Sequence, residues 1–342
     1  MPTNTAAWLM AAKTHPFSIR ESSLSSPEEN QILIKNHAIA INPVDGKIQA
    51  LALFPLTYPT ILGQDVAGEV VAVGSKVTRF AIGDRVIGCA AGFATKNEAE
   101  KAFQTYTILR DNMSSPIPAH LLYEQAVVLP LGVSTAACGL FHFDYLGLDL
   151  PKFPAQTQTG KTILVWGGAS SVGSNAIQLA RAAGYDVITT ASPKNFAFVK
   201  NLGARVVLDY NDSNVVPDTI EVLKETEFAG VFDAIGGRSW IPLLEIVAKI
   251  SAGNRFIATV ISGWPKDLPE SVTIKQVQAL YIMDEHVGKA LWEGFLPSAL
   301  EAGLYLAAPV PLLAGNGIEC LQAAVDLQRQ GTSAKKVVVT LE

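Results

Sequence analysis

Histidine, cysteine and charged side chains are scarce in this sequence. Its 342 residues include five histidines and three cysteines, and Asp, Glu, Lys and Arg together make up 17%. Cys89, Cys138 and Cys320 are too few and too scattered for a disulfide framework, which is typical of a protein from a reducing compartment. We therefore expect a cytoplasmic protein. The histidines show no metal-ligand spacing, so we expect no metal site.

Long apolar runs and a strong excess of one charge are also missing. A membrane span needs about 20 apolar residues in a row, and the nearest candidate, 126–143, is interrupted by Pro130, Gly132 and Gly139, so it fits a buried element. The first four residues begin no basic-then-apolar signal. A net charge of -5 with dispersed Lys and Arg argues against nucleic-acid or membrane partners. The length predicts about two domains with sizeable cores.

One segment, 162–173, has the pattern of a buried strand and a Gly/Ser turn, and the sequence after it predicts a helix over 174–183. Gly168 and Gly173 match the first and third glycines of G-x-G-x-x-G, while Ser170 stands at the second. Such a turn lets a pyrophosphate lie against the N–H groups of a helix N-terminus. Gly/Ser turns without a ligand are common, so the motif alone is weak. We predict that Gly168, Ser170, Ser171, Val172 and Gly173 bind a dinucleotide.

The next strand, 186–191, distinguishes between the two nicotinamide dinucleotides. An NAD site needs a carboxylate at the carboxyl end of this strand, but Asp186 lies at its beginning, about 15 Å from that edge. The tip carries Ser192, Lys194 and Asn195, which offer a hydroxyl and an ammonium without an acid. These residues favour the 2′-phosphate of NADP(H). An exposed polar loop without a ligand is the alternative.

Strands and helices then alternate to residue 259. Apolar strands at 206–208, 230–233 and 255–259 follow amphipathic helices at 196–202, 220–224 and 243–250, which predicts an α/β fold with a doubly wound parallel sheet. Tyr210 falls at the carboxyl end of one strand, where we expect the adenosine, although a surface tyrosine fits equally well. Ile257, on the last strand, is also a predicted cofactor residue.

The sequence before this region has a different texture. Short strands such as 31–35 and 68–73 are broken by Gly and Pro turns, which predicts an antiparallel, β-rich domain. A helix at 317–328 and a strand at 335–341 follow the α/β region. We expect this last strand to return to the first domain. The dinucleotide-binding domain, 130–283, would then be inserted between 1–129 and 284–342.

Several motifs recur in the order that one family shows. They are Ile41-Asn42-Pro43-Val44-Asp45, the segments 63–70 and 80–86 around Gly74, and Leu131-Gly132-Val133-Ser134-Thr135-Ala136. In them the chain resembles the medium-chain dehydrogenase/reductase superfamily, specifically its zinc-free quinone-reductase and enoyl-reductase branch, over essentially its whole length. It is similar to fungal zinc-binding oxidoreductases and trans-acting enoyl reductases. The resemblance implies a GroES-like substrate domain around a Rossmann domain.

The departures from the zinc-dependent members concern the metal. Gln64 stands where they have a histidine ligand, Leu131 lies near the third ligand, and the four-cysteine lobe is missing. An amide and an aliphatic side chain do not replace imidazole and thiolate, so we predict no zinc. Without a Lewis acid, reduction of an unactivated ketone is harder, whereas hydride addition to the β-carbon of an α,β-unsaturated carbonyl remains accessible. We therefore predict NADPH-dependent reduction of the C=C bond of enones, enals or enoyl esters.

The resemblance also implies where this chemistry takes place. In relatives, the segment 42–47 lines the nicotinamide end of the cleft and 129–138 passes beneath the ring. The predicted catalytic residues are Asp45, Lys47, Thr135 and Tyr281. The further cofactor residues are Asn42, Pro43, Asp45, Lys47, Ala334 and Lys335, and the substrate residues are Leu131, Val133, Ser134, Cys138, Val277 and Tyr281. Asp45 and Lys47 could form an ion pair that positions the nicotinamide ribose. Alternatively, Lys47 could help to deliver the proton to the substrate. An ordinary salt bridge within a turn is the third interpretation. Ser134 and Thr135 offer hydroxyl donors to a substrate. Capping of the helix that follows explains one of these two hydroxyls equally well.

Other functions stay open. A quinone or carbonyl reductase is one alternative, and a protein that binds NADPH without catalysis is another. A trans-acting enoyl reductase would add a carrier protein or a polyketide synthase to the small-molecule partner. Residues 271–283 form either the paired edge of a homodimer or the capped edge of a monomer.

Overall fold

The computed structural model describes residues 3–250 and 252–341 and contains two compact units. The first unit combines Met1–Leu131 with Ala307–Glu342, and the second is Gly132–Leu306. The chain therefore leaves one unit and returns to it, as predicted. The α/β unit ends at Leu306 rather than at the predicted residue 283.

The later limit has a physical reason in the second unit. The Tyr305 hydroxyl donates to Asn175 Oδ1 at 2.7 Å. The backbone of Leu306 forms two hydrogen bonds with the Gln178 amide, one donated by its N–H at 2.8 Å and one accepted by its carbonyl at 3.1 Å. Residues 284–306 thus belong to the α/β unit, because their end is fastened to one of its helices.

The first unit is built on two antiparallel-rich sheets. Its smaller sheet has the order β2-β1-β4, and its larger sheet the order β15-β16-β3-β5-β6-β8, with β7 paired to β3. The strands are β1 Asn4–Leu9, β2 Ser18–Ser22, β3 Gln31–Ala40, β4 Thr60–Ile61, β5 Asp65–Val73, β6 Arg85–Cys89, β7 Tyr106–Arg110, β8 Ser114–Pro116, β15 Val310–Asn316 and β16 Lys335–Thr340. The last strand pairs with β3 through Val338 and Ala40, which confirms that it returns to the β-rich domain.

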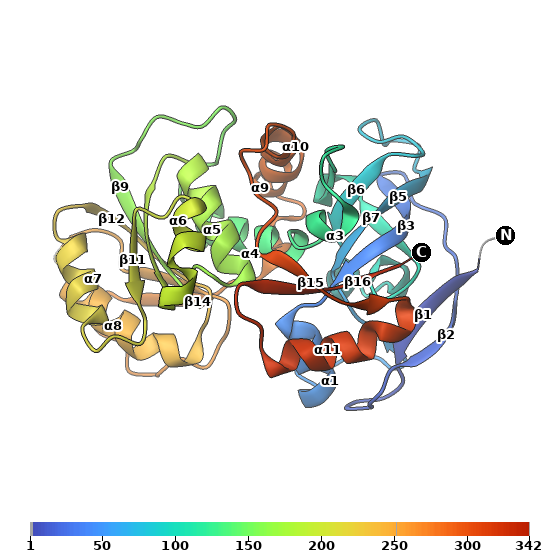
Figure 1. Cartoon of the computed structure of the whole chain (residues 1–342), viewed down its shortest axis with the longest axis horizontal. Coiled ribbons are helices and arrows are strands. Elements are labelled where there is room, and N and C mark those ends of the chain that lie inside the picture. The colour runs from blue at the N-terminus through green and yellow to red at the C-terminus, as the bar shows by residue number, and fades with distance from the viewer. Residues whose placement is uncertain (1–2, 251, 342) are drawn as a thin grey trace. The chain divides into compact units, whose positions relative to one another are not determined.

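Helices of the first unit cover its larger sheet. The helix α1 (Pro43–Leu51) lies beside α11 (Leu321–Gln330) (Figure 1). The side chains of Ile48 and Val325 belong to one apolar core with those of Ile34 and Val66 from the sheet. The shorter helices are α2 Gly92–Thr95 and α3 Tyr123–Ala126, with 3₁₀ turns at Glu98–Glu100, Asp111–Met113 and Ile318–Cys320.

The second unit contains one parallel sheet, as the alternation predicted. Its strand order is β11-β10-β9-β12-β13-β14 and every pairing is parallel. The strands are β9 Lys161–Trp166, β10 Asp186–Ala191, β11 Val206–Asp209, β12 Glu227–Asp233, β13 Phe256–Thr259 and β14 Thr273–Gln276. The edge strand β14 lies inside the predicted segment 271–283.

Both faces of this sheet are buried, so the unit is doubly wound. Side chains alternate across a strand: Leu164 packs in a core with Leu243 and Ile246 of α8, while Ile163 and Val165, which point the other way, are also fully buried. The helix α5 packs against β9, β10 and β12. The helices are α4 Pro130–Phe141, α5 Ser171–Ala182, α6 Phe196–Asn201, α7 Val215–Leu223, α8 Trp240–Lys249, α9 His286–Lys289 and α10 Leu296–Glu301, with a π-helical segment at Ala290–Phe295.

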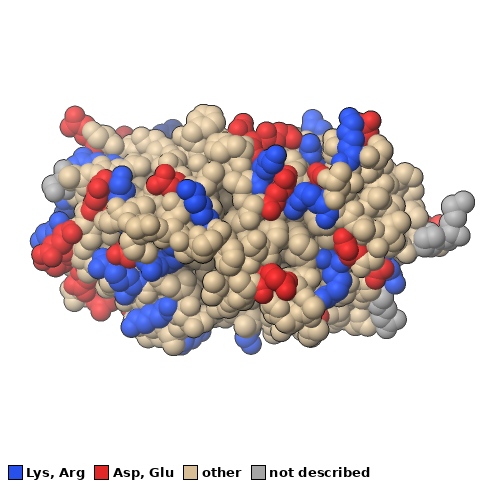
Figure 2. Space-filling model, turned by 90° about the horizontal axis from the view of Figure 1, so that it is seen from above, with Lys and Arg blue, Asp and Glu red and all other residues tan. Residues whose placement is uncertain are grey.

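The apolar run near residue 130 is a buried element. Among the described residues, the stretch Tyr123–Phe141 is long and apolar enough to cross a membrane, but 78% of its apolar 18-residue window is buried inside the structure. Core helices of soluble proteins share this property. On the face shown in Figure 2, positive and negative side chains are interspersed between neutral residues.

Candidate functional site

The turn between β9 and α5 has the geometry of a phosphate site. Ser170 is the N-cap of α5 and its hydroxyl accepts a hydrogen bond from Gly173 N at 3.0 Å. A Cβ on Gly173 would lie 2.2 Å from the carbonyl oxygen of Gly167, and one on Gly168 would lie 2.2 Å from Thr189 Oγ1. Glycine is therefore required at both predicted positions, because strand, turn and helix approach too closely for any side chain.

The first residues of α5 offer donors that the protein itself does not use. The Ser171 hydroxyl is buried and has no hydrogen-bond partner, and Val172 beside it is half-buried. The leading N–H groups of a helix have no carbonyl partner within the helix and carry partial positive charge. These residues fit the pyrophosphate of a dinucleotide.

The tip of β10 is polar and free of acids. Ser192, Lys194 and Asn195 follow the strand in a 3₁₀ turn, where Asn195 Nδ2 donates to the Ser192 hydroxyl at 3.2 Å. Lys194 is exposed, and its ammonium forms no ion pair with the described residues. Asp186, at the other end of the strand, pairs with Arg181 at 2.8 Å and with Arg205 at 3.4 Å. The carboxylate of Asp186 is thus held in ion pairs at the start of β10, at the edge of the sheet opposite to Ser192 and Lys194.

Arg238 is a candidate that the sequence analysis missed. Its guanidinium carbon lies 5.4 Å from the ring centroid of Tyr210, which brings together residues that follow β11 and β12. Gly236 and Gly237, with φ of 70° and 62°, form the turn that presents it. The signal in the sequence was this glycine pair at the end of a predicted strand.

A buried carboxylate holds that turn in place. Asp233, fully buried at the end of β12, accepts hydrogen bonds from the N–H groups of Ile235 and Gly236, both at 3.1 Å. The hydroxyls of Ser239 and Thr259 also donate to it, each at 2.8 Å. Burial raises the pKa of Asp233, although these four donors oppose the shift. Asp233 therefore orders the turn rather than contacting a ligand.

Ile257 does not lie where a cofactor residue is needed. It is the second residue of β13, fully buried, and belongs to the apolar core under α7 and α8. Ligands of a parallel sheet bind outside the carboxyl ends of the strands. The prediction for Ile257 is corrected: this residue stabilises the sheet.

Predicted substrate residues of the second unit meet around α4. Cys138 Sγ donates to the Gln278 carbonyl at 3.2 Å, and Val277 packs so closely on Gly139 that a Cβ there would lie 2.9 Å from its side chain. Tyr281 is 54% exposed, so its hydroxyl is available to a ligand. Its ring lies 6.5 Å from that of His142, a neighbour that the sequence analysis did not select. Burial raises the pKa of the Cys138 thiol to about 12, which keeps it protonated at neutral pH.

The first turns of α4 supply hydroxyls. Val133, Ser134 and Thr135 are all buried, and the Ser134 hydroxyl has no hydrogen-bond partner. An unpaired buried hydroxyl costs free energy, so its position next to predicted substrate residues favours a ligand-binding role over helix capping.

In the first unit, Asp45 and Lys47 take separate roles. The Asp45 carboxylate is fully buried and accepts from Asn42 N at 2.7 Å, so it caps α1, while Lys47 is exposed on the same helix and Pro43 is exposed at its start. The ion pair between Asp45 and Lys47 is not formed, because residues two apart point to different sides of a helix. Burial raises the pKa of Asp45 to about 7; nearby Asp65 adds to the shift, while the Asn42 N–H and Lys336 oppose it.

A buried polar network joins several predicted residues of this unit. Asp65 Oδ2 accepts from Lys336 Nζ and from Asn42 Nδ2, both at 2.9 Å, and Asp65 Oδ1 accepts from Leu131 N at 2.6 Å. Lys336 Nζ also donates to Asn42 Oδ1 at 2.5 Å. Lys336 was not predicted. Alternation along the final strand is the signal that could have found it, since this side chain shares a face with Val338.

The predicted cofactor residues next to Lys336 lie outside this network. Ala334 has a φ of 51° and is half-buried, and Lys335 is exposed at the start of β16. The absence of zinc stays a prediction. Within residues 3–250 and 252–341 there is no group of three or more His, Cys, Asp or Glu side chains that could hold a metal ion.

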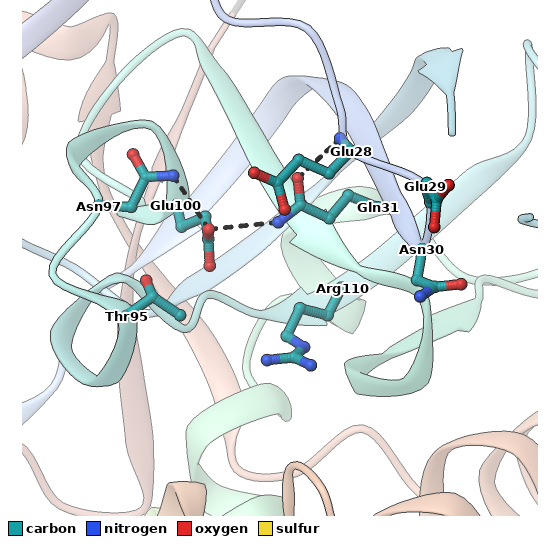
Figure 3. A pocket seen from close by; sticks show the side chains of 8 residues that line it. All are labelled: Glu28, Glu29, Asn30, Gln31, Thr95, Asn97, Glu100 and Arg110. Atoms are coloured by element: carbon teal, nitrogen blue, oxygen red, sulfur yellow. Dashed lines mark hydrogen bonds between the residues drawn. The ribbon is translucent and has the colours of Figure 1, made fainter. Parts of the chain in front are cut away.

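A polar hollow of about 740 Å³ in the first unit contains none of the predicted residues. Figure 3 shows its lining, formed by Glu28, Glu29, Asn30, Gln31, Thr95, Asn97, Glu100 and Arg110. Its polar groups bind one another: Gln31 Nε2 and Asn97 Nδ2 both donate to Glu100 Oε1, at 3.2 and 3.0 Å. We assign it no part in the candidate site.

Comparison with known proteins agrees with this fold. Residues 28–119 match the family model of the alcohol dehydrogenase GroES-like domain, and residues 171–259 match that of the zinc-binding dehydrogenase. The zinc-binding alcohol dehydrogenase domain-containing protein cipB of Emericella nidulans is 52% identical over 338 residues, which cover 99% of this chain and 98% of that protein.

Two further proteins extend the comparison. The trans-enoyl reductase himH of Aspergillus japonicus is 40% identical over 344 residues, covering 99% of this chain and 97% of that protein. The crystal structure of Escherichia coli quinone oxidoreductase complexed with NADPH shares the fold, with a TM-score of 0.73, 20% identity, and coverage of 99% of this chain and 100% of that one. The chain belongs to the medium-chain dehydrogenase/reductase superfamily, as a GroES-like domain combined with a Rossmann domain.

Proposed function

We propose that this protein is a zinc-independent, NADPH-dependent reductase of the C=C bond of α,β-unsaturated carbonyl compounds, acting in the cytoplasm. The observation that carries the proposal is the carboxyl edge of the parallel sheet. There a glycine-dependent turn suits a pyrophosphate, and the neighbouring strand tip offers Ser192 and Lys194 but no acid. Lys194 and the exposed Arg238 add two positive charges that favour a 2′-phosphate.

The bound cofactor would supply the hydride, and the protein's own residues have three tasks. Gly168 and Gly173 keep the turn open for the pyrophosphate, Ser170 caps α5, and the unpartnered Ser171 hydroxyl is assigned to the phosphates. Tyr210, whose ring lies 5.4 Å from the guanidinium carbon of Arg238, gives a planar surface for the adenine. These groups bind and orient, which is the part of catalysis that a protein contributes to cofactor chemistry.

The second task is to stabilise charge on the substrate oxygen. Addition of hydride at the β-carbon places negative charge on that oxygen, and the α-carbon then takes a proton. Within the second unit, we assign the Thr135 hydroxyl as a donor to the oxygen, with Tyr281 as a further hydroxyl. No metal is needed, because the charge is delocalised over the enolate.

The third task is to avoid side reactions. Enones alkylate thiolates readily, yet Cys138 lies among the predicted substrate residues. Burial raises the pKa of its thiol to about 12, which lowers further the small thiolate fraction that an ordinary cysteine has at neutral pH. This environment suits a protein that handles electrophilic substrates.

The similar proteins support the proposal at a coarser level. The name of the trans-enoyl reductase himH supports C=C reduction. The name of cipB supports the alternative of a carbonyl reductase. A quinone reductase and a non-catalytic NADPH-binding protein are the remaining alternatives.

A substrate screen separates these functions. NADPH oxidation is followed with enones, enals, enoyl thioesters, quinones and saturated ketones at equal concentration. We expect turnover with the conjugated carbonyl compounds and little with saturated ketones. Turnover of saturated ketones alone would show a carbonyl reductase, and NADPH binding without any turnover a binding protein.

A further inference from the structure

The ion pair of Lys336 and Asp65 is buried, so its formation requires the desolvation of two charges. Lys336 is 4% exposed and Asp65 is fully buried. Taking both charges out of water carries a large desolvation penalty, and apolar residues of similar volume often stabilise a core as well or better. The network is therefore better explained by the geometry that it imposes than by the stability that it adds.

That geometry concerns predicted site residues. Asn42 lies between the two charged groups, because its Nδ2 donates to Asp65 and its Oδ1 accepts from Lys336. It immediately precedes α1, the helix that carries Lys47. Leu131, whose N–H donates to the other oxygen of Asp65, is the second residue of α4, the helix that carries Ser134 and Thr135. One ammonium on β16 thus fixes the starts of two helices that lie far apart in the sequence.

We propose that Lys336 is the positioning residue of the active site: through Asn42 and Asp65 it sets the start of α1 and the first turn of α4. Lys336 itself does not contact substrate or cofactor in this account. The inference rests on the proposed function, because the two helices are the ones that we assign to nicotinamide and substrate binding.

The charges around Asp45 give this proposal a specific readout. Two buried carboxyl groups, Asp45 and Asp65, face a single buried ammonium, that of Lys336. The Asn42 N–H and the backbone of Gly63 also face Asp45, and the aliphatic part of Arg329 from α11 packs on the adjacent Gly46. Asp65 raises the pKa of Asp45 and Lys336 lowers it. Neutralising either one therefore moves the titration of Asp45 in a known direction.

The test compares Lys336→Met, Asp65→Asn, the double variant that carries both, and Lys336→Arg. The single Lys336→Met variant leaves an unpaired buried carboxylate and is expected to unfold at lower temperature. The double variant removes both charges together, so we expect it to fold with a melting temperature near that of the wild type. We nevertheless expect its NADPH affinity and its kcat on an enone to fall at least tenfold. Lys336→Arg keeps the positive charge, so it should retain most of the wild-type NADPH affinity and most of the kcat.

A matched control is available in the same unit. Lys101 is another buried lysine, which pairs with Glu98 at 2.6 Å and contacts Thr60, none of them predicted site residues. The double variant Lys101→Met/Glu98→Gln also removes both charges of a pair, so its melting temperature should stay near that of the wild type and its NADPH affinity within about threefold.

The pH profile decides between positioning and plain stabilisation. The midpoint of NADPH affinity against pH should move upward in Lys336→Met and downward in Asp65→Asn. A Lys336/Asp65 double variant with wild-type affinity, or unshifted midpoints, would overturn the proposal. A double variant that cannot fold would overturn it too, because the pair would then be a structural requirement. Affinity is measured without substrate, so a wild-type protein that binds NADPH but reduces no enone defeats the proposed function alone.

Discussion

At the scale of single residues, cofactor preference depends on the tip of β10. Lys194 is exposed and makes no ion pair with the described residues, whereas Asp186 is held at the other end of the strand by Arg181 and Arg205. An ammonium beside a phosphate forms a charge-assisted hydrogen bond, and the absence of an acid leaves nothing to repel the phosphate.

Lys194→Ala should therefore weaken NADPH binding selectively, by about 1.5–3 kcal/mol. Dissociation constants for NADPH and NADH, measured by fluorescence titration, check this. Lys200→Ala is the control, because Lys200 is an exposed lysine further along, on α6. Equal losses for both cofactors would contradict the assignment, as would a wild-type protein that binds NADH as tightly as NADPH.

Residues of a local motif could be predicted, and residues that act through distant contacts could not. Gly168, Ser170 and Gly173 lie within a few positions of one another, so their spacing carries the information. Lys336 is recognisable only when its partner Asn42, 294 positions away, is known. The predicted ion pair between Asp45 and Lys47 does not form, because both residues lie on a helix that begins at Pro43 and directs their side chains to different sides.

At the scale of elements, proline misled the prediction of helix starts. The helix α7 begins at Val215 and α8 at Trp240, in each case earlier than predicted, because Pro217 and Pro242 lie in the first turn. There a missing N–H breaks no hydrogen bond of the helix. The start of α5 was predicted three residues late, since Ser170 caps the helix directly.

The capping of α1 by Asp45 makes the stability of the protein depend on pH. Its pKa is about 7 in the folded protein against an ordinary value of 3.8. Between these values the folded state holds a proton that the unfolded chain has released. The contribution of Asp45 to the free energy of unfolding is thus largest below pH 3.8, falls as the pH rises, and is level above about 7.

Asp45→Asn removes this titration and keeps an oxygen that can accept from Asn42 N. We expect the wild type to lose stability relative to Asp45→Asn as the pH is raised from 4.5 to 8 (roughly the window that the linkage gives). Urea unfolding at several pH values measures the difference. A difference that is constant across this range would show that Asp45 does not titrate there.

At the scale of the whole molecule, the order of domains was predictable and one limit was not. Strand periodicity and the returning final strand define the insertion, and contact between β16 and β3 confirms it. The limit at Leu306 depends on Tyr305 and Leu306 bonding to Asn175 and Gln178, contacts that no periodicity reveals.

The whole protein should work without zinc. Gln64 and Leu131 replace ligands that the zinc-dependent members need, and neither side chain substitutes for a thiolate or an imidazole. Elemental analysis of the purified protein should find no stoichiometric zinc, and a strong chelator should leave NADPH oxidation unchanged. One firmly held zinc ion per chain would show that the correspondence of these two positions is wrong.

In the proposed function, hydride goes to carbon–carbon and not to carbon–oxygen double bonds. The most direct measurement is the position of the label after a conjugated enone is reduced with NADPH that carries deuterium at its transferable position. We predict a saturated ketone with deuterium at the β-carbon, found by NMR and mass spectrometry. An allylic alcohol with deuterium on the former carbonyl carbon would contradict the account.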